Sequence, residues 1–360
     1  LRTLRRSPGF SVVALSILAI GIGATTSLFS TAHTVLLKGT PFPDPKRLVA
    51  AQKTIEEQNA GSVSRVDYFD YREHSESFEQ LAAILNFTVT RFATGGPRPV
   101  PVENAYVTWN LFTTLGVDPF LGPGFQAEDE ALGGDTMVVV SHGFWVSRLG
   151  STPEVIGSPL TLDGETATIV GVMPRGFLFL HDADVWRLVN RDGPFDTSRD
   201  SHSHLLIGRL KDGVTITQAR EEVGLISRGL EQEYPDTNAA KGLELSGIQS
   251  FMVRDVRLRL LLLTATAVLV LLIACANVSG LMLARGERRR AELALRTALG
   301  ASRGRLARQL LTESAVLTVS AGMLGLGLAY LLQIALRRLL PMGVPGVNQS
   351  TFDAGAVGFA

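Results

Sequence analysis

Three long stretches of the chain contain no Asp, Glu, Lys or Arg, and they dominate its hydrophobic pattern. They lie between Arg6 and Lys38, between Arg259 and Arg285, and between Glu313 and Arg337. A helix needs about 20 apolar residues to cross the hydrocarbon core, because backbone groups there must bond to one another. The pattern therefore predicts three membrane-spanning helices, over residues 10–37, 260–284 and 312–336.

The first stretch has an alternative interpretation as a cleaved signal peptide, with Ser30, Thr31 and Ala32 near the cleavage site. The apolar region of a signal peptide is about 7–15 residues long. The first stretch is much longer than that, which favours a membrane span.

The basic residues predict the orientation, because short cytoplasmic loops are rich in Lys and Arg. Arg2, Arg5 and Arg6 precede the first span, and eight arginines lie between the second and third. We therefore expect residues 1–9 to form a cytoplasmic tail and 285–311 a cytoplasmic loop. Residues 38–259 and 337–360 then lie outside. Arginines at 254–259 and at 337–338 oppose this orientation, but long translocated domains follow the rule poorly.

The segment 38–259 has the mixed pattern of an α/β domain. Leu160–Val170 predicts a hairpin around Asp163 and Gly164, because Asp-Gly favours a tight two-residue turn. Thr215 and Gln218 predict a capping box ahead of a helix that stops at Pro235. Further strands are expected at 137–140 and 205–210, a short helix at 78–85, and loops at 95–101 and 119–124. The expected fold class is an α+β membrane protein, with a large mixed α/β extracytoplasmic domain inserted between the first and second spans.

Composition changes this picture little. The 34 basic and 34 acidic residues cancel, which gives no indication of nucleic-acid binding or of an acidic substrate. The mean hydropathy of +0.21 is high for a soluble protein. Cys275 is the single cysteine, so neither an intrachain disulfide nor a cysteine metal site can form.

Candidate chemistry is sparse. The sequence has no phosphate loop and no His-Glu-x-x-His motif. Glu128, Asp129 and Glu130 read as a solvated loop. His202 and His204 could present two metal ligands on one face of a strand, or could belong to a polar loop that enters the strand at Leu205. Without a further ligand we expect no metal, no cofactor and no catalytic residue.

The predicted cytoplasmic loop carries an apolar stripe on a short basic helix. Ala291, Leu295 and Leu299 recur every fourth position, and Gly300 is placed to end the helix. A loop this short cannot bury the stripe within itself. The stripe can therefore meet lipid headgroups or a groove on a partner.

Small residues recur every fourth position in the spans, which lets helix backbones approach closely, although chance can produce the same pattern. We expect helix packing in the membrane at Ala19, Gly23, Ser27, Ala276, Gly280, Ala321, Gly325 and Ala329. Asn277 is the strongly polar side chain deep in the second span, where an amide usually bonds to a neighbouring helix.

Nine segments together resemble the permease subunits of MacB/FtsX-type ABC transporters. They are Leu4–Phe10, Ala19–Ala24, Val35–Leu37, Pro41–Pro45, Val170–Pro174, Arg209–Thr215, Ile273–Val278, Glu292–Ala301 and Arg308–Ser314. Each segment is weak alone, but their order around one inserted domain is specific. Two departures stand out. The fourth span of the family is missing, unless 351–360 begins it, and Lys38-Gly39-Thr40 replaces the more usual Arg-Pro-Leu-like entry.

The resemblance implies a MacB-like periplasmic core domain and a mechanism called mechanotransmission. In it, a separate ATPase hydrolyses ATP, and its closure is relayed through the spans to the outer domain for efflux or export of a small molecule, peptide or lipoprotein. The implied ATPase-coupling residues are Ala291, Glu292, Leu295, Arg296, Leu299 and Gly300.

The implied location is the bacterial inner membrane. The implied partners are a cytoplasmic ABC ATPase, a second permease half or a second copy of this chain, membrane lipid, and in some cases a periplasmic adaptor. The chain then reads as one half of a tandem permease or as a single unit. The main alternative is a membrane sensor with an extracytoplasmic ligand domain and no transport, and a membrane-anchored enzyme is a third.

Overall fold

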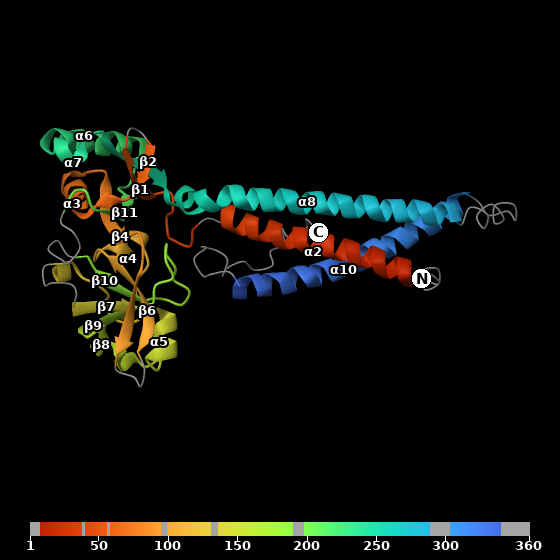
Figure 1. Cartoon of the computed structure of the whole chain (residues 1–360), viewed down its shortest axis with the longest axis horizontal. Coiled ribbons are helices and arrows are strands. Elements are labelled where there is room, and N and C mark those ends of the chain that lie inside the picture. The colour runs from red at the N-terminus through yellow and green to blue at the C-terminus, as the bar shows by residue number, and fades with distance from the viewer. Residues whose placement is uncertain are drawn as a thin grey trace. The chain divides into compact units, whose positions relative to one another are not determined.

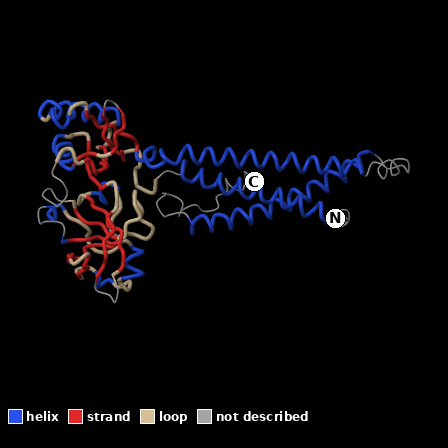
Figure 2. The backbone as a smooth tube through the Cα atoms, viewed as in Figure 1, coloured by secondary structure: helices blue, strands red, loops and turns tan. Residues whose placement is uncertain are grey.

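The computed structural model describes residues 8–37, 40–55, 58–94, 99–130, 136–189, 198–288 and 303–339. It divides into two compact units, whose borders in the sequence lie at 38/39 and 252/253. We call them the helical unit and the inserted domain and describe each by itself (Figures 1 and 2).

Three long helices carry the hydrophobic stretches of the chain: α2 (Pro8–Leu37), α8 (Ile248–Arg288) and α10 (Arg303–Leu339). Each contains a segment long and apolar enough to cross a membrane, namely Val12–His33, Arg257–Ala284 and Ser314–Ala335. No proline interrupts these three segments, so every backbone group inside them can bond within its own helix.

Within the described residues, the strands of the inserted domain join in one twelve-stranded sheet. The strands are β1 (Leu48–Ile55), β2 (Gln58–Gly61), β3 (Val63–Ser64), β4 (Phe78–Leu85), β5 (Val89–Thr94), β6 (Val100–Val107), β7 (Met137–Val140), β8 (Pro159–Leu162), β9 (Glu165–Val172), β10 (Val185–Leu188), β11 (His202–Leu210) and β12 (Lys241–Gly247). The helices are α3 (Arg65–His74), α4 (Leu111–Leu115), α5 (His142–Arg148), α6 (Ile216–Glu233) and α7 (Pro235–Asn238), with 3-10 turns η1 (Ala127–Glu130) and η3 (Pro153–Val155).

The sheet closes on itself at one end. Its order is β10-β7-β9-β8-β5-β6-β4-β11-β1-β12, and β10 also pairs in parallel with β6. Strands β5, β6, β10, β7, β9 and β8 therefore form a closed six-stranded barrel. Valines, leucines and Ile169 from these strands fill one apolar cluster, which is the core of the barrel.

The open part of the sheet, from β4 to β12, carries a core on each face. Residues of α3 and α6 pack with one face, around Tyr68, Val223 and Leu206. Residues of α4 and the aromatic side chains of Phe112 and Trp186 form the core of the other. Neighbouring residues of β11 alternate between the two cores, as the period of a strand requires.

Two local predictions are confirmed. Asp163 and Gly164 both adopt positive φ, 51° and 86°, which is what a tight two-residue turn between β8 and β9 requires. Thr215 and Gln218 form the capping box at the start of α6, and Pro235 lies just beyond its last residue.

The predicted helix at 78–85 is wrong, because these residues form the strand β4. Strand β4 lies between β11 and β6, and six of its eight residues are buried. A strand buried on both faces has an almost continuous apolar run, which its periodicity cannot distinguish from a short buried helix.

Three loop predictions also need correction. Val100 and Pro101 begin β6, although they were expected in a loop. His202 lies within β11 and not in a loop before it. The acidic run is not fully solvated, because Glu130 binds Arg72 in a bidentate pair at 2.8 and 3.1 Å, and Asp129 is 9% exposed.

Candidate functional site

The predicted packing residues of the first and third spans meet in the helical unit. Ala19, Ser27, Ala321 and Ala329 are all buried, with 0 to 8% of their surface exposed. A Cβ added to Gly325 would lie 2.9 Å from the Cβ of Ile22 on α2, and a Cβ added to Gly23 would lie 2.9 Å from the Gly325 carbonyl oxygen. Glycine at these two positions is therefore what allows α2 and α10 to approach so closely.

Polar side chains add two specific contacts to this packing. Gln333 Nε2 donates to Ser30 Oγ at 2.9 Å, which joins α10 to α2. Thr25 Oγ1 lies 2.7 Å from the Gly21 carbonyl oxygen and 3.3 Å from that of Ala267 on α8. Such bonds in a membrane contribute roughly 0.6 kcal/mol each, so they specify the register more than they supply stability.

The second span places its small residues differently. Ala276, Asn277 and Gly280 are exposed, and a Cβ added to Gly280 would meet nothing within 4 Å in the described chain. The buried residues of this span are Ala267, Ala274 and Val278. The hydrophobic pattern does not distinguish these three residues from their neighbours, because every face of the span is apolar.

The predicted coupling residues lie outside the described residues. They are Ala291, Glu292, Leu295, Arg296, Leu299 and Gly300, in the segment 289–302. Their role stays a prediction from the sequence.

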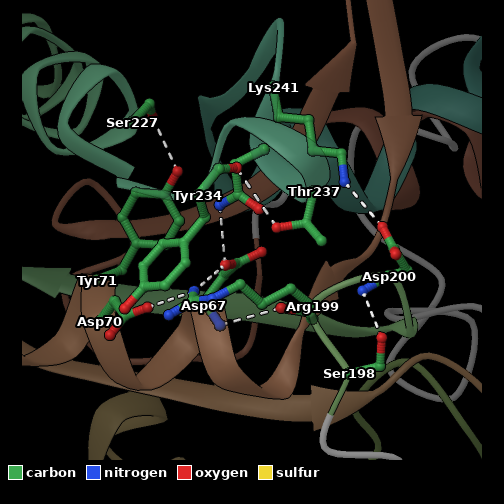
Figure 3. Close-up of polar contacts among 12 residues, drawn as sticks. Asp67, Asp70, Tyr71, Ser198, Arg199, Asp200, Ser227, Tyr234, Thr237 and Lys241 are labelled. Atoms are coloured by element: carbon green, nitrogen blue, oxygen red, sulfur yellow. Dashed lines mark hydrogen bonds and ion pairs between the residues drawn. The ribbon is translucent and has the colours of Figure 1, made fainter. Parts of the chain in front are cut away.

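A buried polar cluster in the inserted domain was not predicted (Figure 3). Arg199 Nη1 donates to Asp67 Oδ1 and Asp70 Oδ2, both at 2.6 Å, and its guanidinium carbon lies 3.6 Å from the centre of the Tyr234 ring. Asp67 also accepts a bond from Asn238 Nδ2 at 3.1 Å. The cluster joins α3 to the residues before β11 and to α7. Both of these segments are more than 100 residues from α3 in the sequence.

Lys53 of β1 lies beside this cluster and is 4% exposed. Its ammonium group contacts His202 Nε2, and burial, followed by the charge of Lys241, lowers the pKa of Lys53 to about 8. Lys53, Lys241, Asp67 and Asn238 line a small pocket. It has room for about one water molecule, which suits a structural water and not a substrate.

The two candidate metal-binding histidines are separately engaged. Burial, followed by the charge of Arg65, lowers the pKa of His204 to about 4, and its Nδ1 lies 3.0 Å from Ser203 Oγ. Burial, followed by the charge of Lys53, also lowers the pKa of His202. Across the described residues, no three His, Cys, Asp or Glu side chains are grouped as a metal ion would need.

Comparison with known families gives two matches. Residues 11–225 match the MacB-like periplasmic core domain, and residues 264–359 match the FtsX-like permease C-terminal region. The chain belongs to the MacB/FtsX family of ABC transporter permeases. The inserted domain is thus its MacB-like periplasmic domain, and the predicted fold class is confirmed.

Individual relatives of this permease are distant. It is 23% identical over 210 residues to the uncharacterized ABC transporter permease YknZ of Bacillus subtilis, which covers 56% of this chain and 50% of YknZ. It is 22% identical over 340 residues to a Pseudomonas syringae protein named the probable syringafactin export ATP-binding/permease protein SyfD. The alignment covers 88% of this chain and 47% of SyfD. The permease thus spans about half the length of these relatives.

A solved structure of the periplasmic region of MacB from Actinobacillus actinomycetemcomitans is also similar. It aligns with a TM-score of 0.43 and 7% identity, over 59% of this chain and 93% of that one.

Proposed function

We propose that this permease couples ATP hydrolysis by a separate cytoplasmic ATPase to movements of its periplasmic domain, and that it serves export. Its family membership and the export role in the name of its relative SyfD support this proposal. The cargo is a small molecule, a peptide or a lipoprotein. The permease lies in the inner membrane with its N-terminus in the cytoplasm. It works with a second permease half or a second copy of itself, and a periplasmic adaptor is a further candidate partner.

Helix α8 is the observation that carries the proposal. Its first residue, Ile248, is fully buried in the core of the periplasmic domain. The same helix continues without a break to Arg288 and contains the second candidate span. Because α8 is one continuous helix, it gives a movement at its cytoplasmic end a direct path along the chain to the domain core.

Purification from the native membrane is the first test. An ABC ATPase should copurify with the permease in near-stoichiometric amount. Its absence, together with a cytoplasmic signalling protein in its place, would contradict the proposal and favour a sensor.

Breaking α8 tests the mechanical link. Four glycines inserted after Val253 should interrupt the helix, because each glycine costs about 1 kcal/mol relative to alanine. A fluorophore on a cysteine at Glu154, in a Cys275→Ser background, would report movement of the domain. We expect the ATPase to copurify as before and the ATP-dependent fluorescence change to disappear.

The matched control is the same insertion after Gly176, an exposed turn residue of the domain. This variant should keep the fluorescence change. An unaltered response after the insertion in α8 would show that the coupling takes another route.

A further inference from the structure

The inside of the six-stranded barrel carries arginine and amide groups among its apolar side chains. Val102 of β6 and Val185 of β10 belong to the barrel core. Asn104 pairs with Val185, and Arg187 follows two residues later on the same strand. Because side chains alternate along a strand, Asn104 and Arg187 lie on the inner face of the barrel.

Arg91 of β5 lies on the same inner face, because it pairs with Val102. Its Nη2 donates to the hydroxyl of Tyr106 at 2.9 Å. Tyr106 follows Asn104 by two residues on β6, so the arginine, the amide and the phenol share one inner surface.

Two guanidinium groups converge on a single carboxylate oxygen there. Arg187 Nη1 lies 3.0 Å and Arg91 Nη1 lies 3.1 Å from Glu165 Oε2. The side chain of Arg187 is 1% exposed, whereas that of Glu165 is 59% exposed. The hydrogen bond from Arg187, and the charge of Arg91, lower the pKa of Glu165. The cations are thus built into the barrel, and the anions beside them belong to exposed side chains, Glu165 and, 3.8 Å from Arg91 Nη1, Asp163.

The same surface holds polar atoms that lack partners within the described chain. Asn104 is fully buried, and neither its Oδ1 nor its Nδ2 makes a hydrogen bond. The buried Nε of Arg91 also makes no hydrogen bond within the described chain. Because buried polar groups in proteins are nearly always hydrogen-bonded, the two donors among these atoms, Asn104 Nδ2 and Arg91 Nε, suit a bound group that accepts hydrogen bonds.

We propose that the barrel binds an anionic group, a carboxylate or a phosphate, between Arg91 and Arg187, and that Glu165 occupies this position when no ligand is present. Barrel mouths are common places for ligand sites, and paired arginines suit both anions. Glu165 is the first residue of β9 and directly follows the exposed turn at Gly164, so it can leave without disturbing the barrel core. This site goes beyond the proposed coupling to an ATPase and does not depend on it.

The test uses the full chain in detergent and the variant Glu165→Gln. Inorganic phosphate and acetate are titrated separately at constant ionic strength, and binding is followed by calorimetry and by the fluorescence of the buried Trp186, the neighbour of Arg187 in β10. Removing the tethered competitor should strengthen binding at least tenfold, or about 1.4 kcal/mol. The tighter of the two probes identifies the preferred anionic group.

Three further variants serve as controls for this interpretation. Glu221→Gln, on the exposed surface of α6, should bind as the wild type does. In the Glu165→Gln background, Arg91→Gln should abolish binding. Asn104→Leu should weaken binding and still raise the midpoint of thermal unfolding, because it removes an unsatisfied buried amide. If Glu165→Gln stays folded and binds neither probe more tightly than Glu221→Gln, Glu165 is only a structural partner of the arginines and the proposal fails.

Discussion

At the scale of single residues, one added atom or one buried charge changes the stability of this permease at particular positions. Gly325 is such a position on α10, and Gly327 on the same helix is not. A Cβ at Gly325 would overlap the side chain of Ile22, whereas a Cβ at Gly327 would meet nothing within 4 Å. The two glycines share a helix and a helix propensity, so they form a matched pair.

We expect Gly325→Val to weaken the contact of α2 with α10 by about 1–3 kcal/mol, the usual cost of overpacking. The measurement is disulfide formation between cysteines placed at Ser30 and Gln333, in a Cys275→Ser background. Cross-linking should slow about tenfold in Gly325→Val and stay unchanged in Gly327→Val. Equal rates in the two variants would mean that the close approach is not needed.

Lys53 gives a prediction about pH. Its pKa in the folded state is about 8, below the ordinary value of 10.5, so the unfolded state binds more protons between these two values. Stability should therefore rise with pH across the window from 8 to 10.5, where the cost of burying the charge is relieved.

Lys53→Met should remove this rise and stabilise the protein at pH 7 by ~1 kcal/mol or more, because it removes a buried charge. Thermal unfolding of the wild type and the variant, at pH 7 and at pH 9.5, measures both effects. Other groups titrate in this range too, so the difference between the two proteins is the quantity to follow. A difference that does not change with pH would contradict the lowered pKa.

At the scale of elements, the central prediction concerns the short helix predicted within the cytoplasmic loop 285–311. Leu295→Asp should weaken docking on the ATPase at least tenfold, or about 1.4 kcal/mol. Burying a leucine side chain contributes roughly 1.5–3 kcal/mol, and the new charge adds a cost of desolvation. The readouts are ATPase stimulation and copurification in nanodiscs, with the folding of the periplasmic domain checked separately.

Thr297→Asp is the matched control for this element, because it adds the same charge on the opposite side of the predicted helix. It should leave docking near the wild-type level. If both variants retain full stimulation and copurification, the stripe more simply rests on lipid headgroups.

At the scale of the whole molecule, the arginine pattern predicts the topology. Reporter fusions at Gly61 and at Ser302 should report opposite compartments, Gly61 outside and Ser302 in the cytoplasm. Gly61 precedes β3 in the periplasmic domain, whereas Ser302 lies between the second and third candidate spans. The same compartment for both fusions would overturn the orientation and, with it, the cytoplasmic site for an ATPase.

Several features of this permease follow from the sequence by itself. The spans are determined locally, because a stretch without charge is a property of consecutive residues. The turn at Asp163 and Gly164 and the capping box of α6 are local too, since each depends on two residues at most three positions apart. The packing positions proposed on α2 and α10 come from the sequence as well, because small residues recur at every fourth position there.

The tertiary structure decided the rest, because it depends on residues that are distant in the chain. Strand β4 takes its form from β11 and β6 on either side, and its own apolar run fits a helix equally well. The barrel closes through a parallel pairing of β10 with β6, some 80 residues earlier in the chain. Arginines are mostly exposed in proteins, and only this closure places Arg187, with Asn104, inside the barrel. Long-range pairing has no signature in a single sequence, so the candidate anion site could be found only in the folded domain.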